Sequence, residues 1–329
     1  MTRLLATALV CALMCSTPTP AWAYLKFGVQ IGSTVRDVRW NQTIRYFVTE
    51  RAVAGVTATE FRDAIGRAFA TWTGVSSGLV RAELQGATIA TPGTFDLRTT
   101  LGFLDRPDLE RVLGATSFLL DATTGEIIES DVFFNTRFDW SVAASGQPSR
   151  IDLESVALHE IGHLLGLGHS AIGETELQPG GGRRVIGSGA VMFPIAMSAG
   201  SIADRVLQPD DEAGLLDLYP STAASESSSI SGRVTRNSQG VFGAHVVTFH
   251  LETGTLIAGF TLSRTGEFVI AGLDPGPHLV RVEPLDDADA TSFFTGDIDV
   301  NFQVTFARQI VVAPRDGSSD DITIEVRSR

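Results

Sequence analysis

The sequence predicts an α+β region followed by a small all-β sandwich, and three observations support this prediction. Apolar side chains recur at helical spacing in residues 57–72, close to short alternating runs that are typical of strands. Residues 157–170 begin as a second helix that is expected to end near Gly166, and they contain three of the six histidines. After residue 229 the helical spacing ends, and short β-rich runs alternate with turn residues.

Length and composition favour two folded domains. A chain of 329 residues exceeds what one ordinary hydrophobic core accommodates. The apolar fraction of 43% and the charged fraction of 19% are those of a folded protein. A formal net charge of −13 argues against nucleic-acid binding and favours neutral or basic substrates. A polar linker over residues 221–229 is expected to join a domain at 24–220 to a second at 230–329.

Residues 1–23 have the features of a secretory signal peptide. An apolar run at residues 4–14 follows Arg3, and small residues at 21 and 23 predict cleavage before Tyr24. This run is too short to span a membrane, and no other apolar stretch is long enough. Both cysteines lie in the leader, so the mature chain is expected to contain no thiol. We therefore expect a secreted protein, extracellular or periplasmic, without a transmembrane segment.

The region before the histidines is predicted to contain strands and one long helix. The first strand is expected at residues 43–48 (TIRYFV). Thr57 can cap the following helix, with Glu60 three residues later completing a capping box. Five side chains line one face of this helix and are expected in the core: Phe61, Ile65, Ala68, Phe69 and Trp72. Two more strands, residues 113–120 and 127–135, are expected to be joined by a turn.

The segment 157–170 (ALHEIGHLLGLGHS) carries a predicted metal site. His159 and His163 are four residues apart, so on a helix they project from one face and can reach the same ion. Gly166 allows the chain to leave the helix and change direction. His169 then returns as the third ligand.

This ligand set predicts a catalytic rather than a structural metal. Three neutral imidazoles with one open position are typical of catalytic zinc, and one Zn²⁺ per chain is expected. Glu160 lies beside the ligands and is the expected general base, which takes a proton from water. Asp152 is expected to cap the helix at its N-terminus. The alternative is an amphipathic helix whose histidines are surface or core residues.

These residues resemble the metzincin zinc endopeptidases, whose signature is HExxHxxGxxH followed by a methionine turn. Ser170, after the third histidine, resembles the matrixin (matrix metalloproteinase) branch. Residues 191–194 (VMFP) are similar to the methionine turn of that branch, and residues 210–215 (DDEAGL) to the helix that follows it. The resemblance extends upstream, more weakly, to about Val38. It implies a metzincin-like twisted β-sheet with three helices.

The resemblance also implies roles for residues around the zinc. Met192 would form an apolar floor under the histidines without binding the metal. Three residues would form one wall of the pocket for the residue after the scissile bond: Phe193, Pro194 and Ile195. Three others would belong to an edge strand that pairs with extended substrate: Gly114, Ala115 and Thr116. An ordinary hairpin is the alternative for that strand.

Two further features leave alternatives open. Four acidic residues offer the oxygen ligands that calcium prefers: Asp121, Glu126, Glu129 and Asp131. Because no regularly spaced loop organises them, a solvated acidic face is the expectation and a Ca²⁺ site the alternative. Between His169 and Met192, the run at residues 180–182 (GGG) predicts a loop that either shapes the cleft or is a passive insertion.

Residues 230–329 predict an antiparallel β-sandwich. Six β-rich runs are separated by turn signals: ISGRV, HVVTF, EFVIAGL, HLVRVEP, TFARQIVV and DITIEV. The glycine-containing turns, such as residues 272–276 (GLDPG), resemble the carboxypeptidase regulatory-like (transthyretin-like) domain. His245, His250 and His278 lack ligand spacing and are expected to be scattered through the sandwich. This domain is expected to contact a surface, a polymer or the substrate, or to stabilise the enzyme.

The leading functional hypothesis is a secreted zinc-dependent endopeptidase that hydrolyses protein or peptide substrates. The alternative is a secreted binding protein with an inert zinc site, whose C-terminal sandwich recognises a surface or polymer. Glu160 weighs against this alternative, because an inert site needs no general base. A third hypothesis applies the same zinc chemistry to a non-peptide amide.

Overall fold

The computed structural model describes most of the chain beyond residue 25. The described residues are 26–32, 34–76, 78–177, 179, 183–220, 228–285, 290–294, 296, 298–315, 317–319 and 321–329. The expected signal peptide, the glycine run at 180–182 and the linker residues 221–227 lie outside these ranges. No helix within the described ranges is long and apolar enough to cross a membrane.

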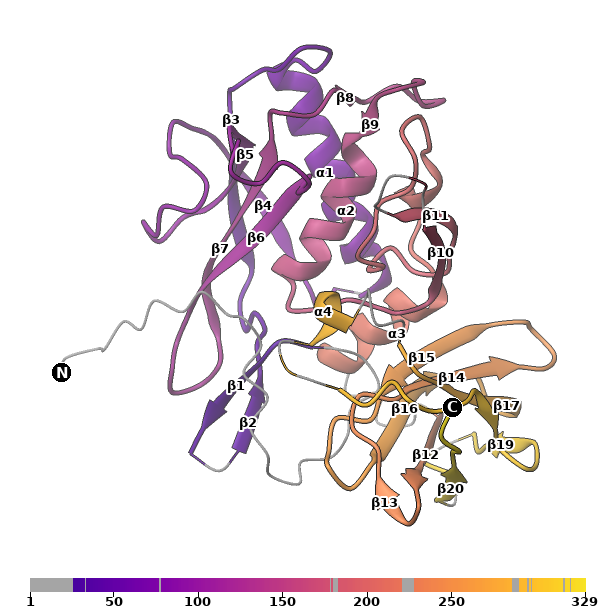
Figure 1. The fold of residues 1–329 in the computed structure, drawn as a ribbon. Helices are drawn as coiled ribbons and strands as arrows, with labels where there is room; N and C mark the ends of the chain where they lie inside the picture. The colour runs from indigo at the N-terminus through magenta and orange to yellow at the C-terminus, as the bar shows by residue number, and fades with distance from the viewer. Residues whose placement is uncertain are drawn as a thin grey trace.

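The N-terminal part is built on a five-stranded sheet with the order β4-β3-β5-β7-β6 (Figure 1). Its strands are β3 (Ile44–Thr49), β4 (Ala82–Thr88), β5 (Thr99–Leu104), β6 (Gly114–Leu120) and β7 (Ile127–Asn135). The first four in this order pair in parallel, whereas β6 runs antiparallel to β7. The two strands predicted at residues 113–120 and 127–135 are therefore confirmed as an antiparallel pair, and β6 forms an edge of the sheet.

Three helices accompany this sheet: α1 (Ala58–Val75), α2 (Leu153–Leu164) and α3 (Pro209–Leu218). The predicted cap of α1 is confirmed, since Glu60 N–H donates to Thr57 Oγ1 and Thr57 N–H donates to Glu60 Oε2. The predicted apolar face of α1 is buried in the main hydrophobic core. Trp72 Nε1 donates to the carbonyl of Leu158 at 2.8 Å, which joins α1 to the helix that carries the histidines.

Several short elements were not predicted. The hairpin β1 (Gly28–Ile31) and β2 (Thr34–Asp37) precedes β3, so the prediction that residues 43–48 form the first strand is wrong. These four-residue strands pair only with each other and lack a buried alternating face, which removes the usual signal. The stretch expected as a loop contains the hairpin β10 (Gly173–Leu177) and β11 (Arg183–Ser188). The other short elements are β8 (Trp140–Ser141), β9 (Ile151–Asp152) and the 3₁₀ turn η1 (Ala203–Arg205).

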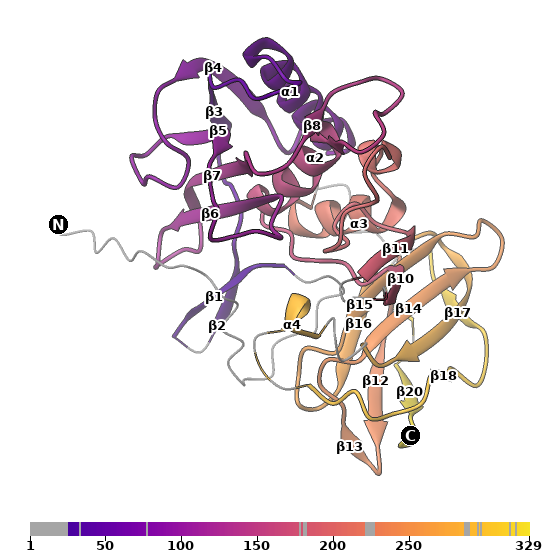
Figure 2. The same ribbon diagram turned by 45° about the horizontal axis from the view of Figure 1, so that its top comes forward.

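We call the described residues from 228 onward the C-terminal β-region. They form two sheets and one short helix (Figure 2). One sheet contains β12 (Ser228–Arg236), β13 (Gln239–Gly240), β16 (Glu267–Leu273) and β20 (Ile322–Glu325). The other contains β14 (His245–His250), β15 (Leu256–Phe260), β17 (Gly276–Glu283), β18 (Thr305–Phe306) and β19 (Val311–Ala313). Buried side chains of both sheets form one hydrophobic cluster. The short helix α4 (Ala290–Phe293) lies between β17 and β18 in sequence.

Three expectations for this region are corrected. Residues 228 and 229, expected in the linker, belong to β12. The run TFARQIVV is divided between β18 and β19. The prediction of an antiparallel sandwich is wrong for β20, which pairs in parallel with β12. No short hairpin turn joins these two strands, so the turn chemistry that sets antiparallel direction elsewhere does not act on them.

The C-terminal β-region packs directly against α3 (Figure 1). Ala213 of α3 is 4% exposed and belongs to the hydrophobic cluster of the two C-terminal sheets. A Cβ at Gly272, whose φ is +74°, would lie 2.8 Å from Cβ of Ala213. Glycine at this position therefore allows β16 to approach α3 closely.

Candidate metal centre

Helix α2 positions the first two histidines. Asp152 caps the helix as predicted, because its Oδ2 accepts the N–H of Ser155 at 2.9 Å. The same carboxylate accepts the guanidinium of Arg205, which holds the helix start in place. After α2 ends, Gly166 adopts a φ of +106°. A Cβ there would clash with the carbonyl of Val38, so only glycine allows this turn.

The turn brings the three predicted ligands together. One ring nitrogen from each of His159, His163 and His169 lies within 4.8 Å of the other two. Nε2 of His163 and Nε2 of His169 are 3.2 Å apart. Within the described part of the chain, no other group of three histidine, cysteine or acidic residues has this geometry.

The Nδ1 atoms of the three rings face backbone carbonyls. His159 Nδ1 lies 2.8 Å from the oxygen of Val191, and His163 Nδ1 lies 2.8 Å from that of Leu167. His169 Nδ1 lies 2.7 Å from the oxygen of Ser292. A carbonyl only accepts, so we assign the proton of each neutral ring to Nδ1, which leaves the Nε2 lone pairs directed to a common point.

This donor set fits Zn²⁺. Two Nε2 lone pairs 3.2 Å apart repel each other unless a cation lies between them. Burial is the main cause that lowers the pKa of His159 to about 4, and burial also lowers the pKa values of His163 and His169. The rings are therefore neutral at physiological pH, which is the form that binds metal.

Glu160 lies at the centre, held by the edge strand. The hydroxyl of Thr116 donates to Glu160 Oε2 at 2.8 Å. Gly114 approaches the same side chain, because a Cβ there would lie 3.1 Å from Cγ of Glu160. Glu160 is 5% exposed, and burial raises its pKa to about 7 while the bond from Thr116 opposes that rise. The carboxylate is thus a proton acceptor near neutral pH.

A cleft of about 750 Å³ contains these groups. It is lined by the three histidines and Glu160, and also by all residues expected in the edge strand and the pocket wall: Gly114, Ala115, Thr116, Phe193, Pro194 and Ile195. The sequence-predicted residues are therefore brought into one cavity, from β6 on one side and the segment after Met192 on the other.

Met192 lies beneath the histidine helix. It is 3% exposed, and a Cβ on Gly162 would clash with its sulfur. Asp211 at the start of α3 holds this turn, because its carboxylate accepts the N–H groups of Val191 and Met192 at 2.8 and 3.0 Å. The carbonyl of Val191 faces His159 in turn, so α3 positions the metal site through the methionine turn.

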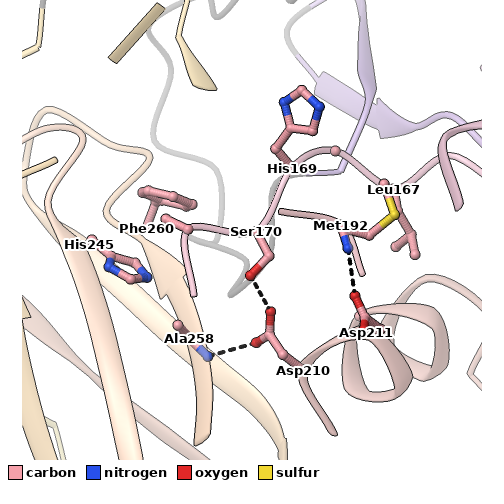
Figure 3. Close-up of a pocket in the computed structure, with 12 residues that line it drawn as sticks. Leu167, His169, Ser170, Met192, Asp210, Asp211, His245, Ala258 and Phe260 are labelled. Atoms are coloured by element: carbon pink, nitrogen blue, oxygen red, sulfur yellow. Dashed lines mark hydrogen bonds between the residues drawn. The ribbon is translucent and has the colours of Figure 1, made fainter. Parts of the chain in front are cut away.

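A second acidic residue links the third histidine to the C-terminal β-region (Figure 3). Asp210 accepts the hydroxyl of Ser170 at 2.6 Å and the N–H of Ala258, on β15, at 2.9 Å. Ser170 follows His169 directly. Burial raises the pKa of Asp210 to about 7, with Asp211 adding to the effect.

Two of the acidic residues considered for calcium, Glu129 and Asp131, accept hydrogen bonds from the backbone. Glu129 accepts the N–H groups of Asp96 and Leu97, and Asp131 accepts those of Gly93 and Thr100. Glu129 and Asp131 are 0% and 2% exposed, so the expected solvated face is wrong for this pair. The backbone of residues 93–100, which includes the start of β5, supplies the donors for both carboxylates, and a Ca²⁺ site finds no support.

The histidines of the C-terminal β-region are buried within it. His245 is within 3.0 Å of Glu283, and the rings of His250 and His278 lie 4.7 Å apart. Both members of this pair have backbone partners. They are side chains of the sheets, in line with the expectation from their spacing.

Sequence reasoning missed several residues that support the site. Asp210 and Asp211 stood out only as the start of a resembling helix, although acidic side chains before an apolar helix are a capping signal. No pattern pointed to the bond between Thr116 and Glu160. The same is true of Ser292 and Phe293, which border the cleft from the C-terminal β-region.

Sequence comparisons show which known proteins this chain is similar to. A family model described as Matrixin matches residues 39–180. Karilysin of Tannerella forsythia is 30% identical over 185 residues, which are 55% of this chain and 33% of karilysin. Metalloendoproteinase 1-MMP of Arabidopsis thaliana is 29% identical over 186 residues, or 55% of this chain and 44% of that protein. Metalloendoproteinase 5-MMP of the same plant is 41% identical over 91 residues, which are 25% of this chain and 20% of that protein. The chain thus spans less than half the length of these relatives.

Proposed function

We propose that the protein is a secreted zinc-dependent endopeptidase with a metzincin domain of the matrixin type; the family model described as Matrixin, which matches residues 39–180, supports this proposal. The observation that carries this proposal is the convergence of three neutral imidazoles on one point beside a buried carboxylate. The similarity to two plant metalloendoproteinases supports the reaction class.

Three residues would hold the metal through Nε2: His159, His163 and His169. When bound, Zn²⁺ supplies a Lewis acid that lowers the pKa of water and polarises a carbonyl. The three backbone carbonyls at Nδ1 keep the rings in the required tautomer. Met192 would act as an apolar support beneath the rings, because its buried side chain packs at Gly162.

Glu160 would be the general base. Its Oε2 is held by Thr116, which leaves Oε1 to accept the proton of the attacking water. The same carboxyl would then give a proton to the leaving amine. Its buried position supports this role, because a raised pKa brings a carboxylate closer to the basicity that proton transfer at neutral pH needs.

Extended substrate would bind along β6. As an edge strand of its sheet, β6 presents backbone groups of Gly114, Ala115 and Thr116 at the border of the cleft. Opposite this strand, residues 193–195 would form the wall of the pocket for the residue after the scissile bond. Proteins or peptides in extended form are therefore the proposed substrates.

The proposal includes the organisation expected from the sequence. Residues 1–23 would be the secretory leader, 24–220 the protease domain and 230–329 a transthyretin-like domain after a short linker. The alternative, a binding protein with an inert zinc site, is not favoured because the buried Glu160 is held in place and the relatives are metalloendoproteinases. Contact of the C-terminal β-region with a surface or polymer stays a prediction.

The test is hydrolysis of casein and of a mixed-peptide library by residues 24–329. Glu160→Ala should lower kcat/KM by about 10²- to 10⁴-fold, because it removes the general base. Each chain of this variant should still bind one zinc ion, measured by metal analysis. A chelator should abolish cleavage by the unmodified chain, and added Zn²⁺ should restore it. Full activity in the variant would contradict the assignment.

A further inference from the structure

The third histidine differs from the other two in the origin of its supporting carbonyl. His159 and His163 face carbonyls of Val191 and Leu167, which belong to the N-terminal part of the chain. His169 faces the carbonyl of Ser292, which lies 123 residues further along the sequence and in the C-terminal β-region. One of the three ring orientations is therefore set by a separate part of the fold.

A neighbouring aromatic residue keeps this carbonyl in place. The ring of Phe293 lies 6.1 Å from the ring of His169, with the planes at 78°. Phe293 is 8% exposed and packs 5.7 Å from Phe260 of β15. Ser292 and Phe293 belong to α4, which is labelled in Figure 1. The segment thus connects β15 to the metal site.

The same strand reaches His169 by a second route. The N–H of Ala258, two residues before Phe260, donates to Asp210. Asp210 accepts the hydroxyl of Ser170, the residue after His169 (Figure 3). Strand β15 therefore supports the third histidine through Phe293 on one side and through Asp210 on the other.

From these contacts we infer that the C-terminal β-region is a structural part of the metal site, with Ser292 and Phe293 as positioning residues for His169. The carbonyl of Ser292 fixes the tautomer and rotation of the His169 ring, and Phe293 fixes the carbonyl. Without this carbonyl the Nδ1 proton has no partner and the ring can turn away from its two neighbours. This inference rests on the proposed role of the histidines in zinc binding, and it assigns a task to the C-terminal β-region within the protease itself.

The test compares two matched variants of residues 24–329. Phe293→Ala removes the ring that contacts His169, whereas Phe294→Ala removes an equally buried ring of the same cluster, which packs on Phe260 and Phe242. Loss of a residue that orients a metal ligand typically lowers metal affinity 10- to 100-fold. We therefore expect Phe293→Ala to lose zinc to a competing chelator about 10-fold faster, and Phe294→Ala to lose it at close to the normal rate.

A spectroscopic measurement separates positioning from general destabilisation. In the zinc-loaded chain, nuclear magnetic resonance should show three protected Nδ1–H protons, one for each ligand histidine. Phe293→Ala should shift or broaden only the His169 signal, while unfolding midpoints of the two variants stay similar. Equal zinc loss in both variants, or an unchanged His169 signal in Phe293→Ala, would overturn the inference.

These measurements do not depend on peptide hydrolysis. If the unmodified chain bound zinc but cleaved nothing, the proposed function would fail while the effect of Phe293→Ala on zinc retention would stand. If the chain cleaved peptides and Phe293→Ala kept its zinc normally, the protease assignment would stand and the role of the C-terminal β-region would be refuted.

Discussion

The hydroxyl of Thr116, on β6, donates to Oε2 of Glu160, on α2, at 2.8 Å. The same hydroxyl lies 3.0 Å from the carbonyl oxygen of Glu160. The edge strand proposed to bind substrate therefore also orients the proposed general base. In the proposed mechanism, substrate binding and proton transfer would therefore be connected through the side chain of Thr116.

Thr116→Val should lower kcat/KM about 10-fold or more, because a hydrogen bond to a charged group contributes about 1.5–3 kcal/mol. Loss of this donor also removes an interaction that lowers the pKa of Glu160. The acid limb of the pH–rate profile should therefore move to higher pH. Thr116→Ser keeps the hydroxyl and should retain most activity. A valine variant with normal kinetics and pH profile would show that Thr116 does not orient Glu160.

Asp211→Ala should destabilise the zinc-loaded chain by about 2–4 kcal/mol, since two buried backbone N–H groups of the methionine turn lose their acceptor. Urea unfolding measures this loss. Glu212→Ala is the matched control, because Glu212 is the exposed neighbour on the same helical turn. A similar effect of both substitutions would argue against a special role for Asp211.

Asp210 should make stability depend on pH. Its folded pKa, about 7, lies above the ordinary value of 3.8 because of burial. The folded state then binds a proton that the unfolded state has released, so this contribution to stability is complete below pH 4 and is lost as the pH rises through 7. The loss is at most about 4 kcal/mol.

Asp210→Asn should remove this dependence, because the amide does not titrate. Its oxygen can still accept from Ala258, and its amino group can donate to the Ser170 oxygen in place of the bond in which the Ser170 hydroxyl donates to the carboxylate. Urea unfolding of the unmodified chain and of the variant at pH 5, 6, 7 and 8 gives the difference between their free energies of unfolding. The contributions of other titratable groups cancel in this difference. The variant should be the more stable protein at pH 8. Parallel pH profiles would contradict the raised pKa.

Gly162→Ala should destabilise the chain by about 1–3 kcal/mol, because the added methyl clashes with the sulfur of Met192 and with Trp72. Alanine normally favours a helix, so the sign of the effect tests the packing. Gly66→Ala in α1 is the control. A Cβ at Gly66 meets open space, and this substitution should stabilise by about 0.5–1 kcal/mol. Stabilisation by both changes would show that Met192 does not pack tightly under α2.

The features that the sequence by itself determined are those with short spacing. They depend on neighbours within one or two helical turns, where the spacing of residues predicts the local structure. Examples are the histidines four residues apart on a helix, the capping box of α1 and the glycine at residue 166. The apolar face of α1 and the hairpin of β6 and β7 were predictable for the same reason. Strands β1 and β2 were not, since four-residue strands with little burial leave no period to detect.

The tertiary structure decided how these pieces support one another. Thr116 reaches Glu160 over 44 residues, Asp210 reaches Ala258 over 48, and Ser292 reaches His169 over 123. Such pairs follow no repeat along the chain, because they arise only when sheets and helices pack and each buried polar group must find a partner. The sequence alone therefore identified the proposed metal ligands, whereas the packing of two hydrophobic cores determined which groups hold those side chains in place.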